Sequence, residues 1–168
     1  MSPSVPEWVR HPVRAINDAI AGSNSEAPEP VEAAEPVSVV RARVLCVDDN
    51  PQVLRLLKRQ LEGSFHVAVA QTAQDALSLL RDDETFDVII SDLRMPDVHG
   101  LTLLKMAREL YPTTQRIILT GLPDPATVSA AGDPSGAEQL IVKPWSRADL
   151  MLAVEQAVAR RRELLASE

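Results

Sequence analysis

The chain has 168 residues, of which 45% are hydrophobic, 24% charged and 3% aromatic, a composition typical of a globular protein with one domain and some additional sequence. Lys and Arg number 17 against 24 Asp and Glu, and the net charge of -7 argues against a nucleic-acid surface as the main function. A single cysteine, Cys46, excludes an internal disulfide, and no apolar run reaches the roughly 18 to 20 residues of a membrane span, so we expect a cytoplasmic protein without membrane insertion.

The first forty residues differ in composition from the rest of the chain. They carry two basic and six acidic side chains and six of the thirteen prolines, and Ser23–Val37 contains four glutamates and no aromatic residue. Such a segment has too little apolar surface to offset the entropy of ordering, so we predict that residues 1–40 are a flexible, acidic, proline-rich extension. Apolar residues at helical spacing indicate a short helix over residues 13–21, which is either a docking helix or a frayed helix without a role.

After Arg41 the sequence pattern changes to short apolar runs that alternate with amphipathic stretches. Val44–Val47 is apolar on both faces, which is typical of a strand buried in a parallel sheet. Asn50 can cap a following helix because Pro51 suits its first position. His66–Ala70 reads as a second strand, and Thr72 is the expected cap of a second helix.

The same alternation continues to the end of the chain. Asp87–Ser91, Arg116–Leu119 and Leu140–Val142 are the expected third, fourth and fifth strands. A helical stripe of apolar residues over Leu101–Leu110 predicts a third helix, and Ser146 is the expected cap of the last one.

Prolines and glycines between the fourth and fifth strands leave room for only a short fourth helix, about Ala126–Ala131. Five strands alternating with helices over residues 41–160 predict an α/β domain with a parallel sheet covered on both faces. Residues 161–168 are left as a C-terminal tail.

Polar residues follow four of the five predicted strands, and these strand ends form the usual functional edge of an open parallel sheet. Asp48 and Asp49 follow the first strand, Asp92 the third, Thr120 the fourth and Lys143 the fifth. Each residue taken alone could equally be a cap, a turn residue or a solvated side chain. Their joint placement at one edge favours a site, and three clustered carboxylates need a divalent cation to offset their repulsion.

The chemistry of these residues suits phosphoryl transfer. Asp48 and Asp49 are placed to hold Mg²⁺, and the Asp92 carboxylate is placed to attack phosphorus and form an aspartyl phosphate. Mg²⁺, the Lys143 ammonium and the Thr120 hydroxyl would then neutralise the equatorial oxygens of the phosphoryl group. Because Pro144 follows Lys143, the peptide bond beside the lysine is a candidate cis bond.

Four motifs together resemble the receiver domain of two-component response regulators. They are VDDN at 47–50, SDLRMPDVHG at 91–100, LTG at 119–121 and VKPW at 142–145. The resemblance covers about residues 43–159. It implies a flavodoxin-like, doubly wound α/β fold with a five-stranded parallel sheet in the order 2-1-3-4-5.

The resemblance also implies roles for individual residues. Asp92 is the expected phosphoacceptor, Thr120 the switch hydroxyl that moves towards the phosphoryl group, and Lys143 the residue that binds it. Mg²⁺ is the expected cofactor, and its implied protein ligands are the carboxylates of Asp48, Asp49 and Asp92 and the backbone carbonyl of Arg94. Leu140 stands where many receivers have Tyr or Phe and lacks the ring of that switch residue, so whether it supports a standard switch is left open.

The partners implied by the resemblance are proteins. The phosphoryl group would come from a sensor histidine kinase or a histidine phosphotransfer protein. A downstream protein would bind the face formed by the fourth helix, the fifth strand and the fifth helix, and whether phosphorylation also causes a homodimer to form is left open. No nucleic-acid partner is expected.

The leading hypothesis is a phosphorylatable receiver that signals by conformational change without an attached output domain and is not an enzyme beyond autophosphorylation and autodephosphorylation. A small phosphatase with an aspartyl-phosphate intermediate is the first alternative. It fits less well because its Asp-x-Asp pattern after the first strand is here Asp48 followed by Asn50 two residues later. The second alternative is a pseudo-receiver that only binds partners, in which the acidic pocket would be eroded.

Overall fold

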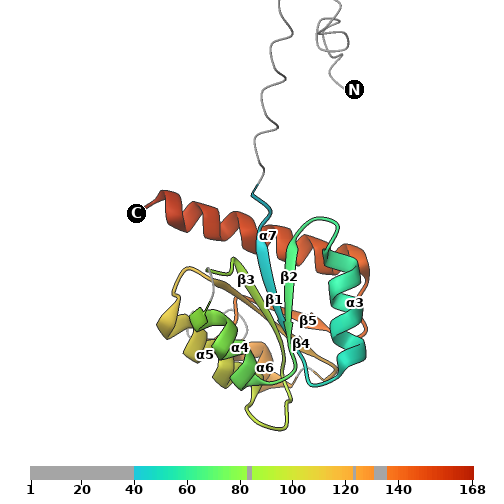
Figure 1. The fold of residues 1–168 in the computed structure, drawn as a ribbon. Helices are drawn as coiled ribbons and strands as arrows, with labels where there is room; N and C mark the ends of the chain where they lie inside the picture. Colours follow the sequence, from blue (N-terminus) through green and yellow to red (C-terminus); the bar gives the residue numbers. More distant parts are fainter. Residues whose placement is uncertain (1–39, 83–84, 123, 131–135) are drawn as a thin grey trace, which may run out of the picture. The chain divides into compact units, whose positions relative to one another are not determined.

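The computed structural model describes residues 40–82, 85–122, 124–130 and 136–168, so the predicted extension over residues 1–40 and its helix at 13–21 lie outside the described residues, apart from Val40. The fold is carried by one compact unit, Arg41–Glu168. Its strands and helices alternate along the chain from β1 to α7 (Figure 1).

All strand pairings in the sheet are parallel. The strands that the described residues form are β1 (Arg43–Val47), β2 (His66–Ala70), β3 (Val88–Asp92), β4 (Gln115–Thr120) and β5 (Gln139–Val142). They lie in the order β2-β1-β3-β4-β5, and β1 pairs with both β2 and β3 near the middle of the sheet (Figure 1). The predicted flavodoxin-like fold class is therefore confirmed.

Three of the helices that the described residues form begin where the sequence places their caps. They are α3 (Pro51–Leu61), α4 (Ala73–Asp82), α5 (Gly100–Leu110), α6 (Pro125–Ala130) and α7 (Arg147–Ala166). Side-chain oxygens at the predicted caps each accept a bond from a free amide of the first helical turn: Asn50 from Gln52 at 2.9 Å, Thr72 from Asp75 at 3.0 Å and Ser146 from Asp149 at 3.0 Å.

The cap of α5 was not predicted. His99 Nδ1 accepts a hydrogen bond from the backbone amide of Leu101 at 3.3 Å. Histidine is outside the group of residues that favour this position, namely Ser, Thr, Asp and Asn. The start of this helix was therefore visible only from its apolar periodicity.

The C-terminal boundary drawn at residue 160 needs correction. Helix α7 continues to Ala166, so residues 161–166 are helical rather than a tail that follows the domain. Arg161 donates a hydrogen bond to Asp87 Oδ1 at 2.5 Å, and Asp87 Oδ2 accepts one from the backbone amide of Arg43 at 2.8 Å. This ion pair ties the last turns of α7 to the amino ends of β1 and β3, a contact that spacing along the chain does not reveal.

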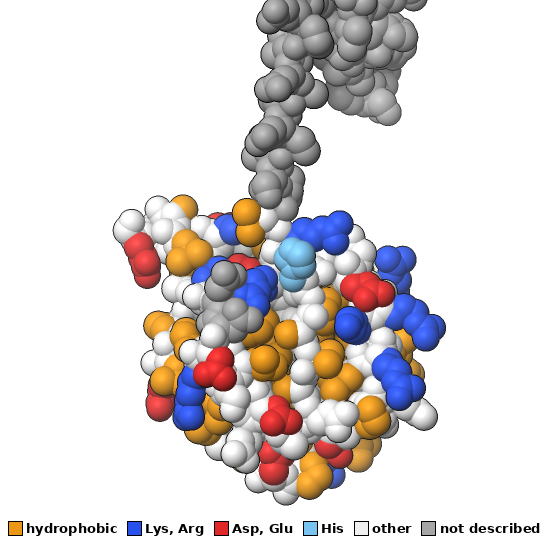
Figure 2. Space-filling model, viewed as in Figure 1, with side chains coloured by type: hydrophobic (Ala, Val, Ile, Leu, Met, Phe, Trp, Pro, Cys, Tyr) orange, Lys and Arg blue, Asp and Glu red, His pale blue; other side chains and the backbone are white. Residues whose placement is uncertain are grey.

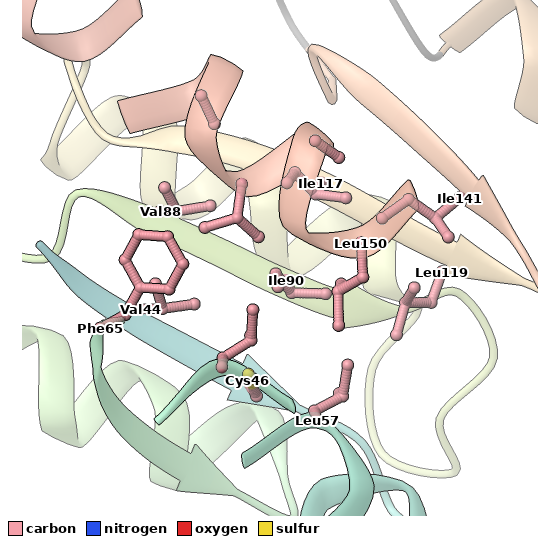
Figure 3. Packing of buried hydrophobic residues seen from close by; sticks show 14 of the residues in the cluster. Val44, Cys46, Leu57, Phe65, Val88, Ile90, Ile117, Leu119, Ile141 and Leu150 are labelled. Carbon is pink, nitrogen blue, oxygen red and sulfur yellow. The ribbon is translucent and has the colours of Figure 1, made fainter. Parts of the chain in front are cut away.

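Two apolar layers hold the sheet between its helices. One lies between the sheet and helices α3 and α7, and Figure 3 shows its side chains converging from both. The other lies between the opposite face of the sheet and helices α4 and α5. Cys46 is completely buried in the first layer, and burial raises the pKa of its thiol to about 12. This cysteine is therefore a core residue.

The charged residues are unevenly distributed over the surface. Lys and Arg side chains gather over α3 at the right of the molecule in Figure 2, and the exposed basic residues of that helix are Arg55, Lys58 and Arg59. Several acidic side chains lie towards the lower edge, where the strands end (Figure 2). Among the described residues, no helix has the length and apolar character needed to cross a membrane.

Candidate functional site

Three carboxylates meet where β1 and β3 end. Val47 of β1 lies opposite Ser91 of β3 in the parallel register, so the next residues, Asp48 and Asp92, emerge side by side. Together with Asp49 they offer three carboxylate oxygens that all lie within 4.8 Å of one another. The structure thus brings together the acidic residues that the sequence singled out.

The three carboxylates differ in burial. Asp48 is 1% exposed and Asp92 8% exposed, whereas Asp49 is open to solvent. Burial raises the pKa of Asp48, and the nearby charge of Asp92 raises it further. A hydrogen bond of 2.8 Å from the backbone amide of Asn50 and the charge of Lys143 act in the opposite direction without cancelling the rise. Burial is therefore the main reason that Asp48 holds a proton more readily than an exposed aspartate.

Lys143 supplies the positive charge of the site. Its Nζ lies 2.8 Å from Asp92 Oδ1 and 3.4 Å from Asp48 Oδ2. Burial alone lowers the pKa of Lys143, but the hydrogen bond to Asp92 and the charges of both carboxylates outweigh burial and leave the pKa raised. The side chain is thus an ammonium that bridges the two buried aspartates.

The donor set fits a Mg²⁺ ion. One ammonium faces three clustered carboxylates, and a hard divalent cation prefers oxygen ligands of this kind. Asp49 is exposed, so the open side of the cluster is accessible to the water and phosphate oxygens that Mg²⁺ usually retains. Arg94, whose backbone carbonyl is the fourth expected ligand, lies two residues beyond Asp92 in the loop that follows β3.

The Thr120 hydroxyl is engaged in a local turn. It accepts a hydrogen bond from the backbone amide of Leu122 at 3.2 Å and lies 3.2 Å from the Leu122 carbonyl oxygen. The turn that was an alternative for this threonine is therefore present in this conformation. Its backbone carbonyl accepts a 2.8 Å bond from the amide of Lys143, and the Lys143–Pro144 peptide bond is cis.

Gly100 is a site residue whose role the sequence did not reveal. A Cβ atom at this position would lie 2.1 Å from the backbone oxygen of Asp92, a distance that real Cβ atoms do not reach. The backbone of α5 thus approaches the backbone of Asp92 as closely as only glycine permits. The motif that contains Gly100 was recognised, but only the tertiary structure shows which atom it touches.

Residues near the fifth strand complete the surroundings of the site. Trp145 is partly buried against the core, and its Nε1 donates a hydrogen bond of 2.8 Å to Gln60 of α3. The tryptophan thereby connects the segment after β5 to the core and to α3. Leu140 is half-buried and packs against the core layer beside α4 and α5.

Comparison with known proteins agrees with this architecture. Residues 44–155 match the family model of the response regulator receiver domain, and the chain belongs to that family. It is 36% identical over 118 residues to the hydrogenase transcriptional regulatory protein HoxA of Cupriavidus necator, an alignment that covers 70% of this chain and 24% of HoxA. The chain thus spans about a quarter of the length of the first curated relatives that it matches.

Solved receiver structures are similar over nearly their whole length. The signal receiver domain of an HD domain-containing protein from Pseudomonas fluorescens has a TM-score of 0.70 and 29% identity, with 86% of this chain and 98% of that chain covered. The chemotaxis protein CheY4 of Vibrio cholerae has a TM-score of 0.64 and 29% identity, with 69% and 98% covered. Receiver domains are signalling modules that accept phosphoryl groups and bind Mg²⁺ through an acidic cluster, so the family assignment favours signalling over the phosphatase alternative.

Proposed function

We propose that Asp92 accepts a phosphoryl group from the phosphohistidine of a sensor kinase or a phosphotransfer protein. The observation that carries this proposal is the position of its carboxylate, at the end of β3, within the acidic cluster and 2.8 Å from the Lys143 ammonium. A carboxylate oxygen would attack phosphorus, the bond from phosphorus to the histidine nitrogen would break, and the imidazole would leave. The product is an acyl phosphate on Asp92.

The neighbouring residues would hold and neutralise the transferred group. Asp48, Asp49, Asp92 and the backbone carbonyl of Arg94 are the proposed ligands of Mg²⁺, which supplies positive charge to the phosphoryl oxygens when it is bound. Lys143 already lies at the Asp92 oxygen and would pair with a phosphoryl oxygen after transfer.

Thr120 is the proposed conformational switch. Its hydroxyl would exchange the bond with Leu122 for a bond to a phosphoryl oxygen, which requires the turn after β4 to move. The Thr120 carbonyl is bonded to the amide of Lys143, so movement of this turn would also act on the end of β5. In this way, occupancy of Asp92 would change the surface that includes β5.

The proposed output surface lies on β5 and α7. A groove of about 430 Å³ is bounded there by residues that include Val142, Trp145 and Leu152. Val142 is 44% exposed and Leu152 54% exposed, which leaves apolar surface available for a protein partner. Signalling through this surface, rather than through catalysis, is the proposed mode of action.

Incubation with acetyl phosphate and Mg²⁺, followed by intact-mass measurement, tests the phosphoacceptor. We expect a gain of one phosphoryl group in the wild-type protein, no gain in Asp92→Asn, and a normal gain in the matched control Asp75→Asn, because Asp75 is exposed on α4. A wild-type protein that stays unmodified with acetyl phosphate, phosphoramidate and a phosphorylated histidine phosphotransfer protein would refute the proposal.

A further inference from the structure

The loop between β3 and α5 is closed beside Asp92. The backbone amide of Leu93 donates to the carbonyl oxygen of Leu119 at 2.9 Å, and the amide of Gly100 donates to the carbonyl oxygen of Leu93 at 2.8 Å. These bonds fix the two ends of the loop but not its middle. The intervening segment, residues 94–99, leaves the sheet at its lower edge in Figure 1 and begins with Arg94.

The middle of this loop is bonded to a different helix. Asp97 Oδ2 accepts a hydrogen bond of 2.8 Å from the backbone amide of Ala73, the first residue of α4. The first amides of a helix have no partner within the helix, and a negative charge is favourable there. The carboxylate of Asp97 therefore satisfies both requirements from outside the helix.

A second group also caps the start of α4. The helix has a cap of its own, because Thr72 Oγ1 accepts a bond from the amide of Asp75 at 3.0 Å. Asp97 differs from Thr72 because it belongs to the loop beside the phosphoacceptor. The bond from Ala73 to Asp97 therefore connects α4 to that loop, which the bond to Thr72 does not do.

The contacts of Met95 and Val98, on either side of Asp97, are apolar and less directional. Met95 is 8% exposed and packs in the same core layer as Ala73, and Val98 packs against that layer. Apolar burial holds the loop at a given depth but does not orient its peptide groups, whereas a charge-assisted hydrogen bond has a preferred direction. The carbonyl of Arg94 therefore lies between two fixed points of the loop, the backbone bonds of Leu93 and the bond of Asp97 to α4.

We propose that Asp97 is a positioning residue for the metal site, because its bond to the amide of Ala73 orients the loop that presents the Arg94 carbonyl to Mg²⁺. This role rests on the proposed function of the site. Within the described residues, the group of carboxylates able to share a metal comprises Asp48, Asp49 and Asp92, so Asp97 acts through the backbone rather than as a ligand.

Calorimetric titration with Mg²⁺ compares two variants that each remove one cap of α4. In Asp97→Ala we expect the dissociation constant for Mg²⁺ to rise roughly tenfold, the lower end of the usual effect of residues that orient metal ligands. In the control, Thr72→Ala, the helix loses a similar cap but the loop keeps its anchor, so Mg²⁺ affinity is expected to stay at the wild-type value. Urea unfolding of both variants checks that their losses of stability are comparable.

Asp97→Asn separates geometry from charge. The amide oxygen of asparagine can still accept the bond from Ala73, so Mg²⁺ affinity should return towards the wild-type value although one negative charge is absent. If Asp97→Ala does not fold, Asp97→Glu takes its place, because the added methylene displaces the carboxylate and should also weaken Mg²⁺ binding.

Three results would overturn the proposal: unchanged Mg²⁺ affinity in Asp97→Ala or its substitute, an equal loss in Thr72→Ala, or an Asn variant as weak as the Ala variant. Phosphorylation is measured separately with acetyl phosphate, phosphoramidate and a phosphorylated histidine phosphotransfer protein. A wild-type protein that binds Mg²⁺ but is phosphorylated by none of these donors would refute the proposed function, while the comparison of Mg²⁺ affinities would still decide the role of Asp97.

Discussion

Replacing Gly100 by alanine tests whether close backbone packing positions the phosphoacceptor. The added Cβ would lie 2.1 Å from the backbone oxygen of Asp92 and 3.0 Å from both the Asp92 carbonyl carbon and the Leu93 Cα. Since real Cβ contacts do not fall below 3.0 Å, α5 and the end of β3 must separate by about 0.9 Å, the difference between 3.0 and 2.1 Å. All three atoms belong to the backbone, so no side-chain rotation relieves the contact.

This displacement should affect both stability and phosphorylation. Overpacking of this kind costs about 1–3 kcal/mol of unfolding free energy. Misplacement of a reacting group by about 1 Å lowers rates on the order of 100-fold. We therefore expect Gly100→Ala to lower the urea midpoint. We also expect it to slow phosphorylation by acetyl phosphate at saturating Mg²⁺ by roughly 10- to 100-fold, as measured by intact mass over time.

Gly63→Ala is the matched control for this experiment. A Cβ at Gly63 would have nothing within 4 Å, and its backbone does not require a positive φ. Alanine there should leave the phosphorylation rate unchanged and raise stability slightly, because it restricts the unfolded chain. A Gly100→Ala protein with the wild-type urea midpoint and the wild-type phosphorylation rate would show that the contact with Asp92 is not a constraint.

Two further predictions concern the core and the last helix. Arg161→Ala should lower the free energy of unfolding by about 1.5–3 kcal/mol, because it removes the charged hydrogen bond to Asp87. The control, Arg160→Ala, breaks the exposed pair with Glu163 and should cost no more than about 0.5 kcal/mol. Equal urea midpoints for the two variants would contradict this prediction. The pKa of Cys46 rises from 9.0 to about 12 on folding, so the unfolded chain loses the thiol proton first and the stability present below pH 9 is lost as the pH rises towards 12. Relative to Cys46→Ala, the wild-type protein should lose about 1.4 kcal/mol per pH unit in that window, and its thiol should react with Ellman's reagent only after unfolding; a parallel pH dependence of the two proteins would refute the assignment.

The acidic cluster was predictable because it depends on topology. Asp48 and Asp92 each follow a run of residues apolar enough to be a buried strand, and parallel strands end at the same edge of a sheet. Lys143 follows from the same rule, since β5 is a parallel strand of the same sheet. Its contacts with both aspartates were decided by the tertiary structure, because β4 separates β5 from β3 and β1.

The contacts of Asp97 and Asp87 were not predictable in the same way. Asp97 bonds to Ala73, 24 residues earlier, and Asp87 bonds to Arg161, 74 residues later. An aspartate in a turn or before a strand has the same appearance in the sequence whether or not it has such a partner. The partner is decided by how helices pack against the sheet, which involves neighbouring elements that are remote along the chain.

Helix α5 also shows which features could be predicted from the sequence and which could not. The periodic stripe of Leu101, Leu104, Ala107 and Leu110 correctly predicted α5. Leu110 is nevertheless 51% exposed, while Leu103, which is not part of that stripe, is completely buried. Periodicity determines that a helix has an apolar face, but the rotation of the helix depends on the side chains opposite it.

The sequence by itself determined a domain of alternating strands and helices with carboxylates, a hydroxyl and an ammonium at its strand ends. Local apolar patterns and the order of the elements along the chain are sufficient to predict these features. Only the tertiary structure decided which atoms meet: the ammonium of Lys143 between two buried aspartates, the backbone of Gly100 against Asp92, and the continuation of α7 to Ala166. These depend on distances of a few ångströms between segments far apart in the chain, which packing sets and sequence spacing does not record.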